Sequence, residues 1–218
     1  MKFNIAIDGP SAAGKSTIAK KLAKELGYAH LDTGAMYRCV AYFSKLKDVS
    51  FDDEEKVASL IDAMQIRFDA QGNVYLNDEN VSNEIRKNEI SMLTSKISAY
   101  PAVREKLVAM QQKMAEHKGY IMDGRDIGTV VLPNAEVKVY MVASVKARAD
   151  RRYKEYVEKQ IEADYDTIYK DIEQRDYQDM NRKTSPLKKA DDAVEIDTSD
   201  MSIEEVVNTI RRLLPAEV

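Results

Sequence analysis

The chain has 218 residues, a formal net charge of −4 and a single cysteine, Cys39. This length fits one compact domain, and the lone cysteine excludes a disulfide framework, so we expect a buried thiol in a reducing, cytoplasmic location. The negative charge argues against a nucleic-acid partner, and no apolar run approaches the roughly 20 residues that cross a membrane.

The first part of the chain alternates short apolar strands with amphipathic helices. Residues 3–7 predict a buried strand, and a glycine-rich turn follows it. A helix over 15–26 comes next, with an apolar stripe at helical spacing, and then a strand over 28–31. Helices over 34–46 and 53–64 complete this part.

The alternation then breaks. Residues 65–69 and 74–76 predict two short strands around a glycine-containing turn, which we interpret as an insertion. A helix that opens at Pro101 is expected to end near Gly119.

The last part of the chain returns to strands and helices. The expected elements are strands over 120–122 and 137–142, two solvated helices over 146–182, a strand over 193–196 and a helix with a capping box at 202–205. Short apolar strands that alternate with helices predict an α/β fold, in which helices cover both faces of a parallel sheet. Ligands of such sheets bind at the carboxyl ends of the strands.

The most specific motif lies directly after the first strand. Residues 9–16 match the pattern G-x-x-x-x-G-K-[ST] at every specified position, and a helix follows. In such a P-loop the backbone N–H groups curl around phosphate oxygens. We expect Lys15 to bridge the β- and γ-phosphates of ATP and the Ser16 hydroxyl to bind Mg²⁺. The residues assigned to nucleotide binding are Gly9, Pro10, Ser11, Ala12, Ala13, Gly14, Lys15, Ser16 and Thr17.

A P-loop alone does not identify the acceptor of the phosphoryl group. A GTPase would be expected to carry an N-K-x-D segment, which this chain lacks, and a motor ATPase usually needs a larger domain. A kinase for a hydroxyl group, of the shikimate or gluconate type, remains an alternative. So does a regulator that hydrolyses ATP slowly without an acceptor.

Arginines that follow the predicted strands favour a phosphate acceptor. Transfer between two phosphates brings polyanions together, and arginine offsets that repulsion best, whereas a hydroxyl acceptor would call for a carboxylate base. The arginines expected to face the cleft are Arg38, Arg125, Arg148, Arg151, Arg152, Arg175 and Arg182. The spacing of Arg175 and Arg182 predicts one helix face, whereas Arg211 and Arg212 are expected to be solvated.

Two aspartates have more than one interpretation. Asp123 ends an apolar strand and could hold Mg²⁺ through water, but it could equally be a turn-forming residue before Gly124. For Asp32, helix capping is the stronger interpretation.

Four segments together resemble the bacterial cytidylate kinases. They are residues 7–16, 31–38, 123–131 and 175–182, the last followed by Ser185-Pro186-Leu187. The resemblance spans essentially the whole chain. It implies a single domain over 1–218, with an acceptor-binding insertion over 62–98 and a lid over 148–184. It also implies ATP- and Mg²⁺-dependent transfer to CMP and dCMP, with a kinase for UMP or AMP as the alternative, and we expect a monomer.

The resemblance also implies a role for each of several residues. The implied contacts to the phosphate of CMP and to the transferring group are Thr33, Arg38, Arg125, Arg175 and Arg182. The implied readers of the cytosine edge are Ser95, Arg104 and Asp126. Asp179 is implied at the ribose and Arg152 at the donor phosphates, and the residues implied in catalysis are Lys15, Arg125, Arg152, Arg175 and Arg182. Without the resemblance, Ser95 and Arg104 would be interpreted as ordinary helix residues.

Overall fold

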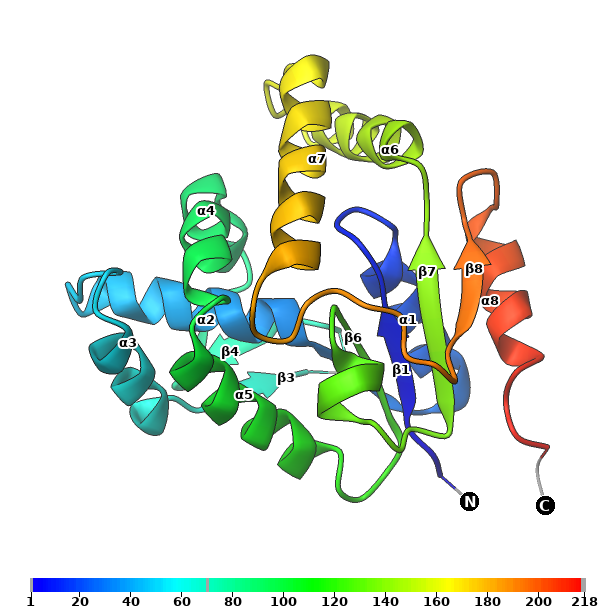
Figure 1. Cartoon of the computed structure of the whole chain (residues 1–218), viewed down its shortest axis with the longest axis horizontal. Coiled ribbons are helices and arrows are strands. Elements are labelled where there is room, and N and C mark those ends of the chain that lie inside the picture. Colours follow the sequence, from blue (N-terminus) through cyan, green and yellow to red (C-terminus); the bar gives the residue numbers. More distant parts are fainter. Residues whose placement is uncertain (1, 70, 217–218) are drawn as a thin grey trace.

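The central element is a parallel sheet. Its strands are β1 (Ile5–Asp8), β2 (Ala29–Asp32), β6 (Tyr120–Gly124), β7 (Val137–Val142) and β8 (Val194–Asp197). The structure is a computed structural model that describes residues 2–69 and 71–216, and within these ranges the five strands lie in the order β2-β6-β1-β7-β8 (Figure 1). The predicted α/β fold is confirmed.

Helices cover both faces of this sheet, because successive strand residues point to opposite sides. Ile5 and Ile7 pack in one core, whereas the intervening Ala6 packs in the other with Met122, and all four are fully buried. The first core is covered by α1 (Lys15–Leu26) and α8 (Ile203–Arg211), and the second by α2 (Thr33–Leu46) and α5 (Pro101–Met114).

Local signals explain where several helices begin and end. Asp32 caps α2 by accepting a hydrogen bond from the backbone N–H of Ala35 at 2.9 Å, which agrees with the capping interpretation. Ser202 and Glu205 form the predicted capping box of α8. Gly27 ends α1 in the left-handed conformation, with φ of 65°.

The region between α2 and α5 contains more structure than the sequence predicts. Its strands form an antiparallel sheet of β3 (Ile66–Phe68), β4 (Val74–Leu76) and β5 (Glu79–Asn80). The predicted strand pair omits β5, which has only two residues, both polar and exposed. The sequence predicts no bounds for the helix α4 (Asn88–Ile97), although Ser95, which lies in it, is interpreted above as a helix residue. The helix expected over 53–64 is observed as α3 (Glu54–Leu60). It ends earlier than expected, because the chain then tightens into a 3₁₀ turn.

Two charged helices, α6 (Val145–Glu158) and α7 (Tyr165–Asn181), stand beyond the carboxyl ends of β1 and β7 (Figure 1). They pack together through a small cluster that includes Ala149, Ile168 and Ile172. The prediction that Arg175 and Arg182 share a helix face is wrong, because Arg182 has an extended backbone (ψ 144°) that ends α7. No helix in the described ranges is long and apolar enough to span a membrane.

Candidate active site

The loop between β1 and α1 curls around the side chain of Lys15. Gly9 and Gly14 have φ values of 151° and 89°, a region that favours glycine. A Cβ atom on Gly9 would lie 2.1 Å from the carbonyl oxygen of Met141, so this position requires glycine. Among the described residues no side chain caps α1, which leaves its first backbone N–H groups for a ligand. The loop is therefore suited to an anion such as phosphate.

Lys15 is buried at the centre of this loop, whereas Thr17 lies exposed on α1. The Lys15 Nζ donates a hydrogen bond to the carbonyl oxygen of Pro10 at 2.8 Å. Burial lowers the pKa of Lys15 to about 7, and the charge of Arg125 acts in the same direction. The charge of a bound phosphate would oppose both effects and favour the ammonium form.

Asp123, the fourth residue of β6, has a buried carboxylate beside the loop. Its Oδ2 accepts a hydrogen bond from the Ser16 hydroxyl at 2.7 Å, and its Oδ1 lies 2.6 Å from Nε2 of His30 on β2. Burial acts to raise the pKa of Asp123, but the contact with His30, together with the charge of Lys15, holds it below its ordinary value. Ser16 and Asp123 thus place one hydroxyl and one carboxylate next to the phosphate loop. The Thr33 hydroxyl donates to the backbone carbonyl of Asp123 at 2.8 Å, and so ties the start of α2 to β6.

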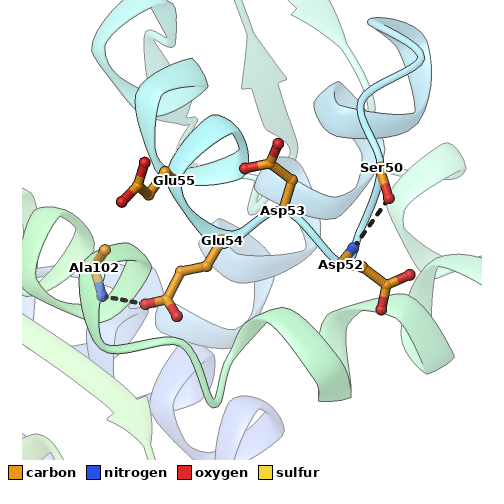
Figure 2. A pocket seen from close by; sticks show the side chains of 6 residues that line it. All are labelled: Ser50, Asp52, Asp53, Glu54, Glu55 and Ala102. Carbon is orange, nitrogen blue, oxygen red and sulfur yellow. Dashed lines mark hydrogen bonds between the residues drawn. The ribbon is translucent and has the colours of Figure 1, made fainter.

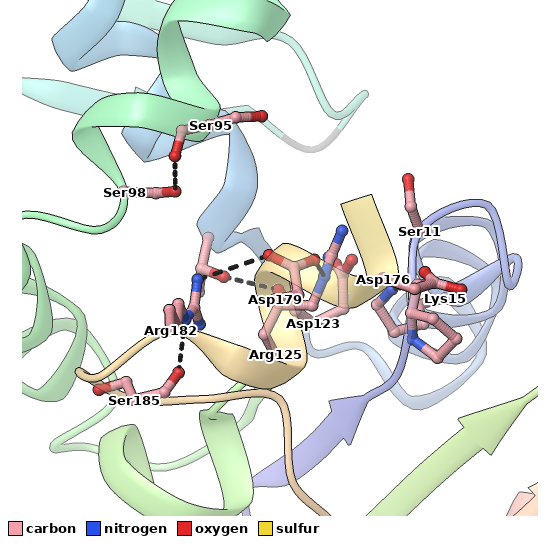
Figure 3. Close-up of polar contacts among 12 residues, drawn as sticks. Ser11, Lys15, Ser95, Ser98, Asp123, Arg125, Asp176, Asp179, Arg182 and Ser185 are labelled. Atoms are coloured by element: carbon pink, nitrogen blue, oxygen red, sulfur yellow. Dashed lines mark hydrogen bonds and ion pairs between the residues drawn. The ribbon is translucent and has the colours of Figure 1, made fainter. Parts of the chain in front are cut away.

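Arginines from several elements lie at the carboxyl end of the sheet, as Figure 3 shows in part. They are Arg38 on α2, Arg125 after β6, Arg152 on α6, Arg175 on α7 and Arg182 after α7, and all are half-buried. Asp179 is a carboxylate among them. It accepts a hydrogen bond from Nε of Arg125 at 2.9 Å and lies 3.6 Å from Nη1 of Arg182.

These arginines act on one another through their charges. Burial, followed by the charge of Arg125, lowers the pKa of Arg175 to about 10. Burial also lowers the pKa of Arg38, with contributions from the charges of Arg152 and Arg125. Cations that disfavour one another in a half-buried site are stabilised by an anion. The cluster, together with the nearby P-loop, is thus suited to more than one phosphate group.

A buried ion pair lies on the α5 side of this cluster. Nη2 of Arg104 contacts Oδ2 of Asp126, and Nη1 of Arg104 donates to the Ser98 carbonyl at 2.9 Å. Within the described residues, Nε of Arg104 and the hydroxyl of Tyr37 have no hydrogen-bond partner. Ser95 forms no hydrogen bond with Arg104 or Asp126: its hydroxyl donates to the Ser91 carbonyl of its own helix at 3.3 Å. Ser98 links the two indirectly, because its hydroxyl donates to the Ser95 carbonyl at 3.1 Å (Figure 3).

Two residues that the sequence did not single out, Asp8 and His30, also shape the site. The Asp8 carboxylate accepts hydrogen bonds from the backbone N–H groups of Ile127 and Gly128 at 2.8 and 2.7 Å, which fixes the loop that follows Asp126. Its place directly before the first P-loop glycine was a signal that could have identified it. His30 follows no motif and could not have been identified in this way.

The expectation that Arg148 faces the cleft is wrong. It is buried, and it donates to the Ser11 carbonyl at 3.1 Å and to both carboxylate oxygens of Asp176 on α7, at 2.9 and 2.5 Å. It therefore joins the P-loop to the outer helices. Arg151 is turned to Thr198 instead, where its guanidinium contacts the hydroxyl at 3.2 Å and the carbonyl.

A separate hollow lies beside α3 and the start of α5 (Figure 2). Its lining is acidic, with Asp52, Asp53, Glu54 and Glu55. Glu54 accepts a hydrogen bond from the backbone N–H of Ala102 at 3.0 Å and so caps α5. Because these carboxylates would repel phosphate groups, the nucleotide site is not here.

The fold and the site define a P-loop kinase, since a phosphate loop, a carboxylate at a strand end and converging arginines meet at one edge of a parallel sheet. A solved shikimate kinase from Bacteroides thetaiotaomicron is similar in fold, with a TM-score of 0.52 and 13% identity over 98% of each chain.

The sequence comparisons are more specific. The model of the family described as cytidylate kinase matches residues 5–216. The cytidylate kinase of Listeria welshimeri is 49% identical, over 100% of this chain and 98% of the relative. That of Streptococcus pneumoniae strain 70585 is also 49% identical, over 96% of each. The chain belongs to the cytidylate kinase family.

Proposed function

We propose that this protein transfers the γ-phosphoryl group of ATP to CMP, giving ADP and CDP, with dCMP as a second acceptor. The arginine cluster beside the P-loop supports transfer between two phosphates, since Arg38, Arg125, Arg152, Arg175 and Arg182 would offset the repulsion of donor and acceptor. The acceptor oxygen is already anionic, so positioning and charge stabilisation suffice and no general base is needed.

The observation that carries the choice of CMP is the buried pair of Arg104 and Asp126. Cytosine offers an N4 amino donor beside the N3 and O2 acceptors. Asp126 accepts from N4, while the unpartnered Nε of Arg104 donates to an acceptor, and the Ser95 hydroxyl completes the base site. Uracil presents a carbonyl to Asp126 instead. That mismatch costs about 2–4 kcal/mol, or roughly 30- to 1000-fold in kcat/KM.

Mg²⁺ fits the side chains next to the P-loop. It typically binds through one or two protein oxygens and keeps several waters and substrate phosphates as ligands. Ser16 and Asp123 supply one hydroxyl and one carboxylate within hydrogen-bond distance of each other. Bound there, the ion would neutralise charge on the donor phosphates. Lys15 holds the β- and γ-phosphates.

The outer segments have proposed roles of their own. The segment 148–184 acts as a lid that brings Arg152 and Arg175 onto the phosphates and excludes water from ATP. The segment 62–98 carries the acceptor-binding Ser95. Outside this segment, Thr33 contacts the phosphate of CMP and Asp179 its ribose. We propose that the enzyme works as a cytoplasmic monomer.

The test is ADP release from Mg·ATP with CMP, dCMP, UMP, AMP, GMP and shikimate offered in parallel. We expect the highest kcat/KM with CMP or dCMP, and no ADP release above background without an acceptor. A preference for shikimate, or hydrolysis that ignores the acceptor, would contradict the proposal.

A substitution at the base site sharpens this test. Asp126→Asn replaces an acceptor by an amide that can donate to the O4 carbonyl of uracil, so the CMP to UMP ratio of kcat/KM should fall by about 30-fold or more. This ratio does not depend on how much of the variant is folded. Asp191→Asn, at an exposed turn, serves as the matched control and should leave the ratio unchanged.

A further inference from the structure

A buried histidine contacts the active-site carboxylate and has no role in the function proposed above. The side chain of His30 is only 8% exposed, and its Nε2 lies 2.6 Å from Oδ1 of Asp123. Because an ionised carboxylate can only accept, Nε2 carries the hydrogen and donates it. Ser16 donates to the other oxygen, so the carboxylate is held from both sides.

Binding of a metal ion would change the hydrogen bonds that hold the carboxylate of Asp123. Among the described residues, only His30 and Ser16 donate side-chain hydrogen bonds to the carboxylate oxygens of Asp123. The neighbouring Thr33 hydroxyl donates to the backbone carbonyl of Asp123 instead, and Lys15 donates to a carbonyl of the P-loop. If the Ser16 hydroxyl turns to Mg²⁺, His30 is the only one of these donors that still holds the carboxylate.

We propose that His30 is a positioning residue for the metal: it holds Oδ1 of Asp123 so that Oδ2 stays directed at Ser16 and at the Mg²⁺ that accompanies the nucleotide. This inference rests on the proposed Mg²⁺-dependent function. The terminal torsion of an aspartate is broad, so an unsupported carboxylate samples several orientations. Groups that orient a metal-binding side chain are typically worth about 10- to 100-fold in metal affinity.

The chain provides a matched set of variants. His30→Phe keeps a ring of similar size and removes the donor, whereas His30→Gln places an amide nitrogen close to the position of Nε2. The second histidine, His117, is exposed, so His117→Phe makes the same substitution away from the site. Thermal unfolding of each variant reports any general loss of stability.

The measurement is calorimetric binding of ADP, first in EDTA and then at increasing Mg²⁺. We expect His30→Phe to raise the Mg²⁺ concentration for half-maximal enhancement about tenfold or more, with little change in metal-free ADP affinity. His30→Gln should restore most of the loss, and His117→Phe should match the wild type. If His30→Phe does not fold, His30→Asn replaces it, because its shorter amide cannot reach Asp123, and the same shift is expected.

Three results would overturn the inference. One is an unchanged Mg²⁺ requirement in the donor-free variant. Another is an equal loss of ADP affinity with and without Mg²⁺, which indicates a purely structural role. The third is a wild-type protein whose ADP binding ignores Mg²⁺. In all three cases the transfer to CMP is still judged separately, by the ADP-release assay.

Discussion

Lys15 should take up a proton when a nucleotide binds. The free protein holds this amine with a pKa of about 7, because burial disfavours the ammonium form and the charge of Arg125 adds to the effect. Near pH 8, only about a tenth of the lysine is then protonated. The phosphates of ADP bring negative charge against the amine and raise its pKa, so binding should take up about 0.9 proton.

The sign of the pH dependence follows from this uptake. Because the complex binds more protons than the free protein, the affinity for ADP should fall as pH rises above 7, nearly tenfold per pH unit between about pH 8 and 9. Below about pH 6 the amine is already charged in the free protein, so the contribution of Lys15 to the pH dependence should disappear.

Calorimetric titration of ADP in buffers of different ionisation enthalpy measures the uptake directly. The terminal phosphate of ADP is fully ionised near pH 8 and cannot take part, given a phosphate pKa of about 6. Lys15→Met should abolish the uptake, whereas His30→Gln should retain it, which excludes the buried imidazole as its source. A binding enthalpy that is independent of the buffer, or a net release of protons, would refute this account of Lys15.

Three further substitutions or treatments test other parts of the structure. Gly9→Ala should lower the free energy of unfolding by about 2–4 kcal/mol and abolish ADP binding, because its Cβ would overlap a backbone carbonyl. Gly27→Ala, where the Cβ meets open space, serves as the control and should lower the free energy of unfolding by only about 1 kcal/mol, as measured by denaturant unfolding. Arg104→Met should cost about 3–5 kcal/mol by leaving Asp126 buried and unpaired, and adding Asp126→Asn should recover part of that loss; an additive double variant would argue against the pair. Cys39 should resist alkylation in the folded protein, because burial raises the pKa of its thiol to about 12, and rapid labelling would contradict this.

Elements with strong local signals could be predicted from the sequence. The P-loop has fixed spacing, and the capping box at Ser202 acts within four residues, so both follow from neighbouring positions. The two-residue strand β5 and the π-helical turn at Ile127–Val131 have no such pattern. That turn depends on Asp8, which holds its N–H groups from a strand 119 residues earlier.

The sequence indicated which residue types gather at the candidate site, but not which of those residues contact each other. Arginines after strand ends indicated a polyanion site, yet nothing local indicates that Arg104 contacts Asp126 or that Arg148 spans the P-loop and α7. Such contacts are made by packing between distant elements. His30 illustrates the limit, since a histidine in a short strand has no distinguishing sequence context and acquires its contact only when β2 pairs with β6.

Transfer of the phosphoryl group to CMP is tested most directly by following that group itself. The protein is incubated with ATP labelled in the γ-phosphoryl group and with CMP, and the label is located among the products. We expect the label to appear in CDP in step with ADP formation, and Lys15→Ala to lower the rate by about 1000-fold or more. Label that appears only in inorganic phosphate, at a rate that CMP does not change, would contradict it.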